Sequence, residues 1–111
     1  MKCMWIKHLL MQIGGNIEEA REKILEAYQW QDKSEVIARW HKDMAAQHLA
    51  FNEPAVTMVR KHIEEMRSEH KDEHGEPDKG MMGKCEVYEE WLEHLLPGMA
   101  EARAMVDRFG K

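Results

Sequence analysis

Apolar residues recur along the C-terminal third of the chain at alternating intervals of four and three residues. This is the spacing of the a and d positions in a helix that packs along its whole length. Pro97 lies inside the repeat without shifting it, on the opposite face, so the pattern predicts one bent helix over about 81–109. The repeat consists of Met81, Cys85, Tyr88, Leu92, Leu95, Met99, Ala102, Val106 and Phe109.

The N-terminal region carries the same repeat. It runs unbroken through Gly14-Gly15, although two glycines inside a helix cost about 2 kcal/mol relative to alanine. The pattern therefore predicts one helix over about 2–31. The alternative is a turn at the glycines, with Asn16 capping a second helix. The repeating positions are Ile6, Leu10, Ile13, Ile17, Ala20, Ile24, Ala27 and Gln31.

Two shorter helices are predicted between these long ones. Asp32 with Glu35 resembles a capping box, which begins a helix over about 33–51. Its predicted core positions are Ile37, Trp40, Met44, Gln47 or His48, and Phe51. Asn52-Glu53-Pro54 is typical of a helix end followed at once by a new helix start, so a third helix is predicted over about 53–74. Its inward positions are Val56, Val59, Ile63, Met66 and His70.

These four segments predict an all-α fold in one domain, residues 1–111. The expected architecture is an antiparallel up-down-up-down four-helix bundle with two long outer helices (2–31 and 81–109) and two shorter ones (33–51 and 53–74). The short helices cover only part of the long ones, so the two chain ends would overhang side by side. In this arrangement Cys3 and Cys85 lie roughly 40 Å apart, too far for a disulfide.

The overhanging ends carry more apolar surface than two helices can bury between them. A second subunit or a helical protein partner is the expected cover, which predicts a homodimer or a related assembly. The predicted interface consists of Trp5, Ile6, Leu9, Leu10, Met99, Met105 and Phe109. The leading functional hypothesis is therefore a small interaction or assembly module without catalytic activity.

Composition and charge restrict the remaining functional classes. The 111 residues are 43% hydrophobic and 33% charged, which is typical of a globular helical chain. The formal net charge of −5 argues against general nucleic-acid binding. The apolar segment 1–13 is interrupted by Lys7 and His8, is too short to span a bilayer and lacks a small-residue cleavage site. Two cysteines imply no disulfide framework, and we expect a cytoplasmic protein.

His70 and His74 form the best candidate for a metal site, because residues four apart share one helix face. In the four-helix arrangement Cys85 lies opposite them, with Met81 and Met82 nearby. Imidazole, thiol and thioether ligands suit Zn²⁺ or Cu(I), which predicts a metal-binding bundle as the second hypothesis. The alternative is a solvated acidic helix end. The Glu-x-x-His pattern of di-iron bundles is absent, since no histidine has a glutamate three residues before it.

Two acidic pairs support a third hypothesis. Glu19-x-x-Glu22 and Glu69-x-x-Asp72 resemble the Mg²⁺-binding motifs of all-α nucleotide pyrophosphatases, a resemblance that covers only these eight residues. The number of residues between the two motifs is larger than is usual in that family. The resemblance implies Mg²⁺-dependent nucleotide hydrolysis at Glu19, Glu22, Glu69 and Asp72. The chain carries no phosphate-binding glycine loop, C-x-x-C motif or nucleophile elbow.

Overall fold

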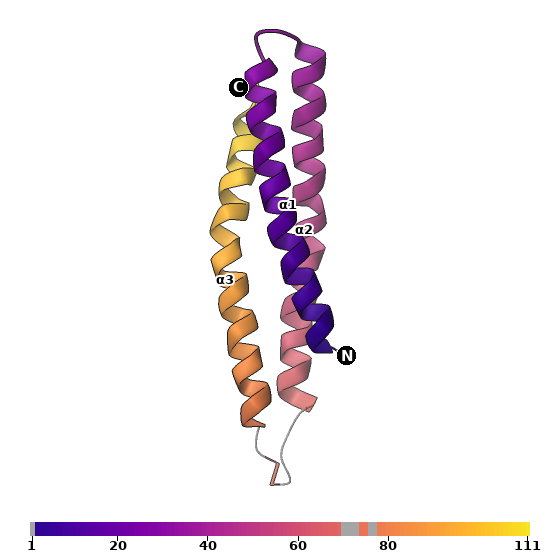
Figure 1. The fold of residues 1–111 in the computed structure, drawn as a ribbon, viewed down its shortest axis with the longest axis vertical. Helices are drawn as coiled ribbons and strands as arrows, with labels where there is room; N and C mark the ends of the chain where they lie inside the picture. The colour runs from indigo at the N-terminus through magenta and orange to yellow at the C-terminus, as the bar shows by residue number, and fades with distance from the viewer. Residues whose placement is uncertain (1, 70–73, 76–77) are drawn as a thin grey trace.

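In the described part of the chain, three long helices run up, down and up along one rod in the computed structural model (Figure 1). Helix α1 spans Lys2–Trp30, α2 spans Glu35–Glu69 and α3 spans Lys79–Arg108. The structure describes residues 2–69, 74–75 and 78–111, which contain no strand. The rod measures 66 × 20 × 16 Å. Its radius of gyration of 18.0 Å exceeds the ~13 Å of a compact domain of this length, so each helix exposes a long side.

The predicted four-helix bundle is wrong, because the two short central helices are one. Helix α2 continues through Asn52-Glu53-Pro54. Asn52 does not cap a new helix: its side chain is fully buried, and its Nδ2 donates to the carbonyl oxygen of Ile13 at 3.2 Å. Pro54 lies on the exposed face of α2, where water can solvate the carbonyl that loses its N–H partner. A bend at an exposed proline also curves a helix around its core.

The helix starts also differ from their predicted positions. Ser34 Oγ accepts a hydrogen bond from the backbone N–H of Ile37 at 3.3 Å, so Ser34 caps α2 instead of Asp32. Asp78 caps α3, since its Oδ1 accepts from the N–H groups of Gly80 at 2.8 Å and Met81 at 3.2 Å. Helix α3 therefore begins before the predicted residue 81.

Because α2 runs antiparallel to both of its neighbours in the chain, α1 and α3 run parallel to each other. Tyr88 Oη donates to the carbonyl oxygen of Cys3 at 3.4 Å, and Tyr28 Oη donates to that of Met105 at 3.0 Å. The predicted 40 Å separation of the cysteines is therefore wrong, because Cys85 lies one helical turn from Tyr88. Both thiols are free. The predicted overhang is wrong too, since the C-terminal half of α2 covers the first turns of α1 in one hydrophobic cluster.

The long apolar stripes of α1 and α3 form the core as predicted. One helix runs through Gly14-Gly15 and one through Pro97. Every apolar member of the α1 stripe is buried: Ile6, Leu10, Ile13, Ile17, Ala20, Ile24 and Ala27. The buried members of the α3 stripe are Cys85, Leu92, Ala102 and Val106. The N-terminal repeat therefore belongs to one uninterrupted helix, as the unbroken phase predicted.

The predicted core of residues 33–51 is wrong, whereas that of the following segment is confirmed at three of its five positions. Val59, Ile63 and Met66 are buried, Val56 is half-buried, and His70 lies outside the described residues. Because α2 is continuous, the register of these buried residues extends back into 33–51 at other positions than those predicted. The buried residues of the first half are Ala38, Ala45, Leu49 and Asn52. Ile37, Trp40 and Phe51 are instead 37%, 55% and 68% exposed. Within the described residues, no helix combines the length and the apolar composition that crossing a membrane requires.

Candidate interaction surface

The structure places two of the three predicted metal ligands. Cys85 is fully buried, and its Sγ lies 3.9 Å from the carbonyl oxygen of Ile63. Desolvation by this burial raises the pKa of the Cys85 thiol. His74 is exposed, and His70 lies outside the described residues. Among the residues that the structure describes, no three His, Cys, Asp or Glu side chains are grouped to hold a metal ion. The zinc or copper site stays a prediction, and Cys85 occupies a core position.

The acidic pairs are not brought together. Glu19 and Glu22 are exposed on α1, whereas Glu69 ends α2 at the opposite end of the rod. Because Ile13 contacts Asn52, the register places Glu69 about 23 residues, or roughly 35 Å, from the level of Glu19. Asp72 lies outside the described residues. Carboxylates at such separations do not share one Mg²⁺.

The predicted assembly residues are spread along the rod and do not gather at one end. Trp5, Ile6, Leu9 and Leu10 lie near the start of α1, whereas Met99, Met105 and Phe109 lie near the end of the chain. Ile6 and Leu10 have no exposed surface, and the Phe109 ring packs edge-on against Tyr28 at 5.2 Å between centroids. Of these seven residues only Trp5, at 60%, is largely exposed. They do not form one surface.

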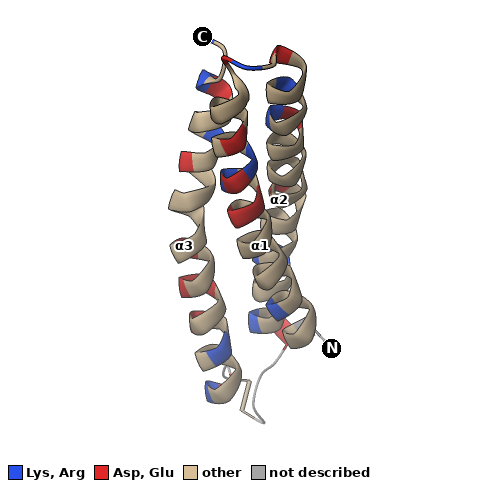
Figure 2. Cartoon of the chain, turned by 45° about the horizontal axis from the view of Figure 1, so that its top comes forward, with Lys and Arg blue, Asp and Glu red and all other residues tan. Residues whose placement is uncertain are grey.

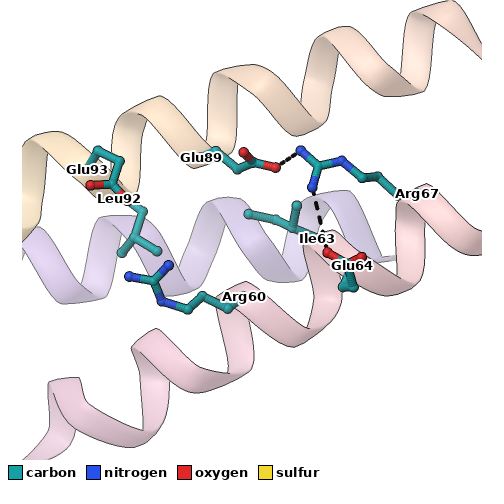
Figure 3. Close-up of a pocket in the computed structure, with 7 residues that line it drawn as sticks. All are labelled: Arg60, Ile63, Glu64, Arg67, Glu89, Leu92 and Glu93. Atoms are coloured by element: carbon teal, nitrogen blue, oxygen red, sulfur yellow. Dashed lines mark ion pairs between the residues drawn. The ribbon is translucent and has the colours of Figure 1, made fainter.

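A groove between α2 and α3 carries charges of both signs (Figure 3). Arg67 forms ion pairs with Glu64 on its own helix at 3.6 Å and with Glu89 on α3. The complete lining is Arg60, Ile63, Glu64, Arg67, Glu89, Leu92 and Glu93. Two arginines face three glutamates, so the groove has no excess positive charge with which to bind an anion. The pairing of Arg67 with Glu89 connects the two helices.

A polar cluster crosses the middle of the rod. Asn16 Nδ2 donates to Asn52 Oδ1 at 3.1 Å, and His48 Nδ1 lies 3.2 Å from Asn16 Oδ1. Asn52 Nδ2 in turn donates to the carbonyl oxygen of Ile13. A buried asparagine whose hydrogen bonds depend on one alignment fixes the register of two helices, because any shift leaves it unpaired. This cluster therefore fixes the register of α2 relative to α1.

Helix α2 carries a second apolar stripe, on the side that faces away from α1 and α3. At about 100° per residue, most of its members lie opposite the buried residues of the same helix, whereas Ile37 and Met44 lie at the border with the buried face. We name this face the outer strip: Val36, Ile37, Trp40, Met44, Gln47, Ala50, Phe51, Pro54, Thr57 and Met58. It extends over roughly 33 Å. Gln47, Ala50, Phe51 and Pro54 line a shallow groove at its centre.

The outer strip is almost uncharged. Between Val36 and Met58, Asp43 lies on this face and Arg39 lies at its edge, in line with Thr57. Figure 2 shows α2 mostly tan through its middle, between charged turns near its two ends. From Met44 to Val59 the whole helix carries a single charge, Glu53. A face of this length with so few charged side chains is typical of a surface that another helix covers.

Side-chain size is inverted between the two faces of α2. In its N-terminal half the inner face buries Ala38, Ala45 and Leu49, whereas the aromatic side chains of Trp40 and Phe51 are mostly exposed. Ala45 belongs to one hydrophobic cluster with Ala20 and Ala27 of α1, and alanines let two helices approach closely. That close approach leaves no room inside for an aromatic ring. The largest side chains of this half of α2 are therefore left uncovered within one chain.

The sequence held a signal for the outer strip that its interpretation missed. Residues 37, 40, 44, 47 and 51 follow one helical phase, whereas residues 56, 59, 63 and 66 follow another. Two phases in one uninterrupted helix mean two apolar faces. The proline between them suggested two helices instead.

No family model, curated protein or solved structure matches this chain.

Proposed function

We propose that this protein is a small self-assembling helical-bundle module without catalytic activity, which binds a second copy of itself through the outer strip of α2. The observation that carries the proposal is the inverted size pattern of α2, with alanines inside and Trp40 and Phe51 outside. Fully burying a large apolar side chain is worth about 1.5–3 kcal/mol, and the exposed parts of these two rings correspond to a little over half of that each. A free monomer forgoes that free energy, and an assembled pair gains it twice. The proposal expects this assembly in the cytoplasm.

The exposed area of the outer strip is sufficient for a weak dimer. Val36, Trp40 and Phe51 are 78%, 55% and 68% exposed, and Ile37 and Met58 add to them. At about 150–250 Å² for each aromatic side chain and somewhat less for each aliphatic one, the strip offers on the order of 500 Å² per copy. Two copies then bury roughly 1,000 Å², the lower limit for a specific interface.

A second copy suits this surface better than a charged partner. Buried charges without partners are costly, so the cover must itself be nearly uncharged over the same length. The outer strip satisfies that requirement.

The test compares two exposed tryptophans on different surfaces. We expect the wild-type chain to have a concentration-dependent mass approaching twice 13.1 kDa in light scattering or sedimentation. Trp40→Glu with Phe51→Glu should give a folded monomer, because both side chains are exposed and contribute little to the core. Trp5→Glu is the matched control, since Trp5 is 60% exposed but lies outside the outer strip. It should leave self-association unchanged.

Circular dichroism of each variant separates dissociation from unfolding. A wild-type chain that stays monomeric at high micromolar concentration contradicts the proposal. So does a dimer that Trp5→Glu dissociates and the α2 variant does not, which would favour the terminal surface of Trp5, Leu9 and Phe109.

A further inference from the structure

Two opposite charges lie in line on the exposed side of α2. Asp43 and Lys61 are both exposed and 18 residues apart, which is about five full turns at 100° per residue. Asp43 belongs to the face of the outer strip, and Lys61 continues that face just beyond Met58. The point midway between the two charges is the level of residue 52, next to the shallow groove at Phe51.

This side of α2 points away from the core of the same chain. Asp43, Phe51 and Lys61 each lie two residues from a buried residue, which is about 160° around the helix. The three buried residues are Ala45, Leu49 and Ile63. A second copy can therefore contact both charges and the ring without displacing α1 or α3.

An antiparallel pair of copies brings the two charges together. If its two-fold axis passes at the level of residue 52, residue 43 of one copy has the same height as residue 61 of the other. Because Asp43 and Lys61 lie in line along α2, each Asp43 is then beside the Lys61 of the second copy. The pair contains this contact twice.

The large side chains of the outer strip interdigitate in the same arrangement. Trp40, Phe51 and Met58 lie within about 20° of one another around α2. Phe51 is one residue from the axis, so the Phe51 rings of the two copies meet there. Met58 of each copy has the height of residue 46 of the other, between its Trp40 and its Phe51. Side chains that alternate in this way along a seam are typical of paired helices.

Small side chains lie at the centre of this arrangement. Ala50 of one copy has the height of Pro54 of the other, and both residues line the shallow groove. They let the two helices approach closely at the axis, so the Phe51 rings can touch.

A parallel pair in register lacks the charge match. It places Asp43 opposite Asp43 and Lys61 opposite Lys61. Like charges that face each other across an interface oppose association. The positions of these two charges therefore favour the antiparallel orientation.

We infer that Phe51 of one copy packs against Phe51 of a second copy across a two-fold axis at the level of residue 52, with Asp43 of each copy beside Lys61 of the other. The inference rests on the proposed function, because it specifies how the second copy covers the outer strip.

Charge reversal tests the contact between Asp43 and Lys61. Asp43→Lys alone, or Lys61→Asp alone, turns two attractive contacts into repulsive ones and should weaken self-association roughly tenfold. The double variant should regain the wild-type affinity, because opposite charges again face each other. In a parallel pair every one of these variants keeps like charges opposite one another, so none should change the affinity. Glu22→Lys is the matched control for net charge, since Glu22 is exposed on α1.

Cysteine crosslinking tests the orientation in a Cys3→Ser background. A mixture of Asp43→Cys and Lys61→Cys chains should form an interchain disulfide when oxidised glutathione is added, because the two positions are adjacent across the interface. Asp43→Cys by itself is the matched control. Its two copies lie roughly 27 Å apart in the antiparallel pair and should not crosslink, whereas in a parallel pair they are neighbours.

The outcomes separate this inference from the proposed function. A dimer that Trp40→Glu with Phe51→Glu dissociates, but that Asp43→Cys by itself crosslinks or whose affinity ignores the charge reversals, overturns the inferred arrangement and leaves the outer strip as the interface. Absence of any dimer overturns both. Regained affinity in the double variant, together with crosslinking only in the mixture, supports both.

Discussion

Replacing Asn52 with alanine should destabilise the fold more than any exposed polar substitution in α2. The Asn52 side chain is fully buried and makes two hydrogen bonds, from its Nδ2 to the carbonyl of Ile13 at 3.2 Å and to its Oδ1 from Asn16 at 3.1 Å. Both connect α2 to α1. Alanine removes them and leaves a cavity between the two helices.

The magnitude follows from these contacts. Each hydrogen bond contributes about 0.5–1.5 kcal/mol net. The lost amide group leaves a cavity that costs on the order of 1 kcal/mol. The expected loss is therefore about 2–4 kcal/mol, a large share of the ~6–17 kcal/mol typical of a chain of this length. Asn16 is only half-buried, so its freed Nδ2 can turn to water, which favours the lower part of this range.

Urea unfolding followed by circular dichroism measures the effect. The measurement is made in the Trp40→Glu, Phe51→Glu background, so that association does not contribute to the apparent stability. Thr57→Ala is the control: Thr57 is exposed and its Oγ1 donates only to the carbonyl of Glu53 at 3.3 Å, so its removal should change the free energy of unfolding by less than about 0.5 kcal/mol.

A double-mutant cycle with Asn16→Ala isolates the direct contact. The coupling energy between Asn16 and Asn52 should be about 0.5–1.5 kcal/mol. Additive effects of the two substitutions, or a loss below about 0.5 kcal/mol for Asn52→Ala, would refute the role of the polar cluster in setting α2 against α1.

Three further predictions concern α1 and the thiols. Gly15→Ala should raise the free energy of unfolding by up to about 1 kcal/mol and the Tm by about 4 °C, because Gly15 is helical and a Cβ there meets no atom within 4 Å; a lower Tm in thermal unfolding would contradict this. Burial raises the pKa of Cys85 above the ordinary 9.0, so the unfolded chain ionises first and wild-type stability should fall between about pH 9 and 10 more than that of Cys85→Ala. In the native protein a thiol reagent should modify Cys3 before Cys85, and equal rates would show that Cys85 is accessible.

The sequence by itself determined the two long helices and their core faces. An unbroken 4, 3 repeat requires one continuous stripe, and a stripe of that length must be buried, so Ile6, Ile24 and Val106 could be assigned without coordinates. Helix continuity across Gly14-Gly15 and Pro97 could also be predicted, because the phase of the repeat is the same on both sides of each.

Only the tertiary structure decided the middle of the chain. Locally, Asn52-Glu53-Pro54 satisfies the rules for a helix end and a new cap, and a break there would leave four helices. The decision depends on a distant group: the carbonyl of Ile13 accepts the Asn52 amide, and that hydrogen bond exists only when α1 lies alongside. The same dependence hid the outer strip. Whether alanines or aromatic rings of α2 face inward depends on how closely α1 approaches, and that distance is a property of the packed pair of helices.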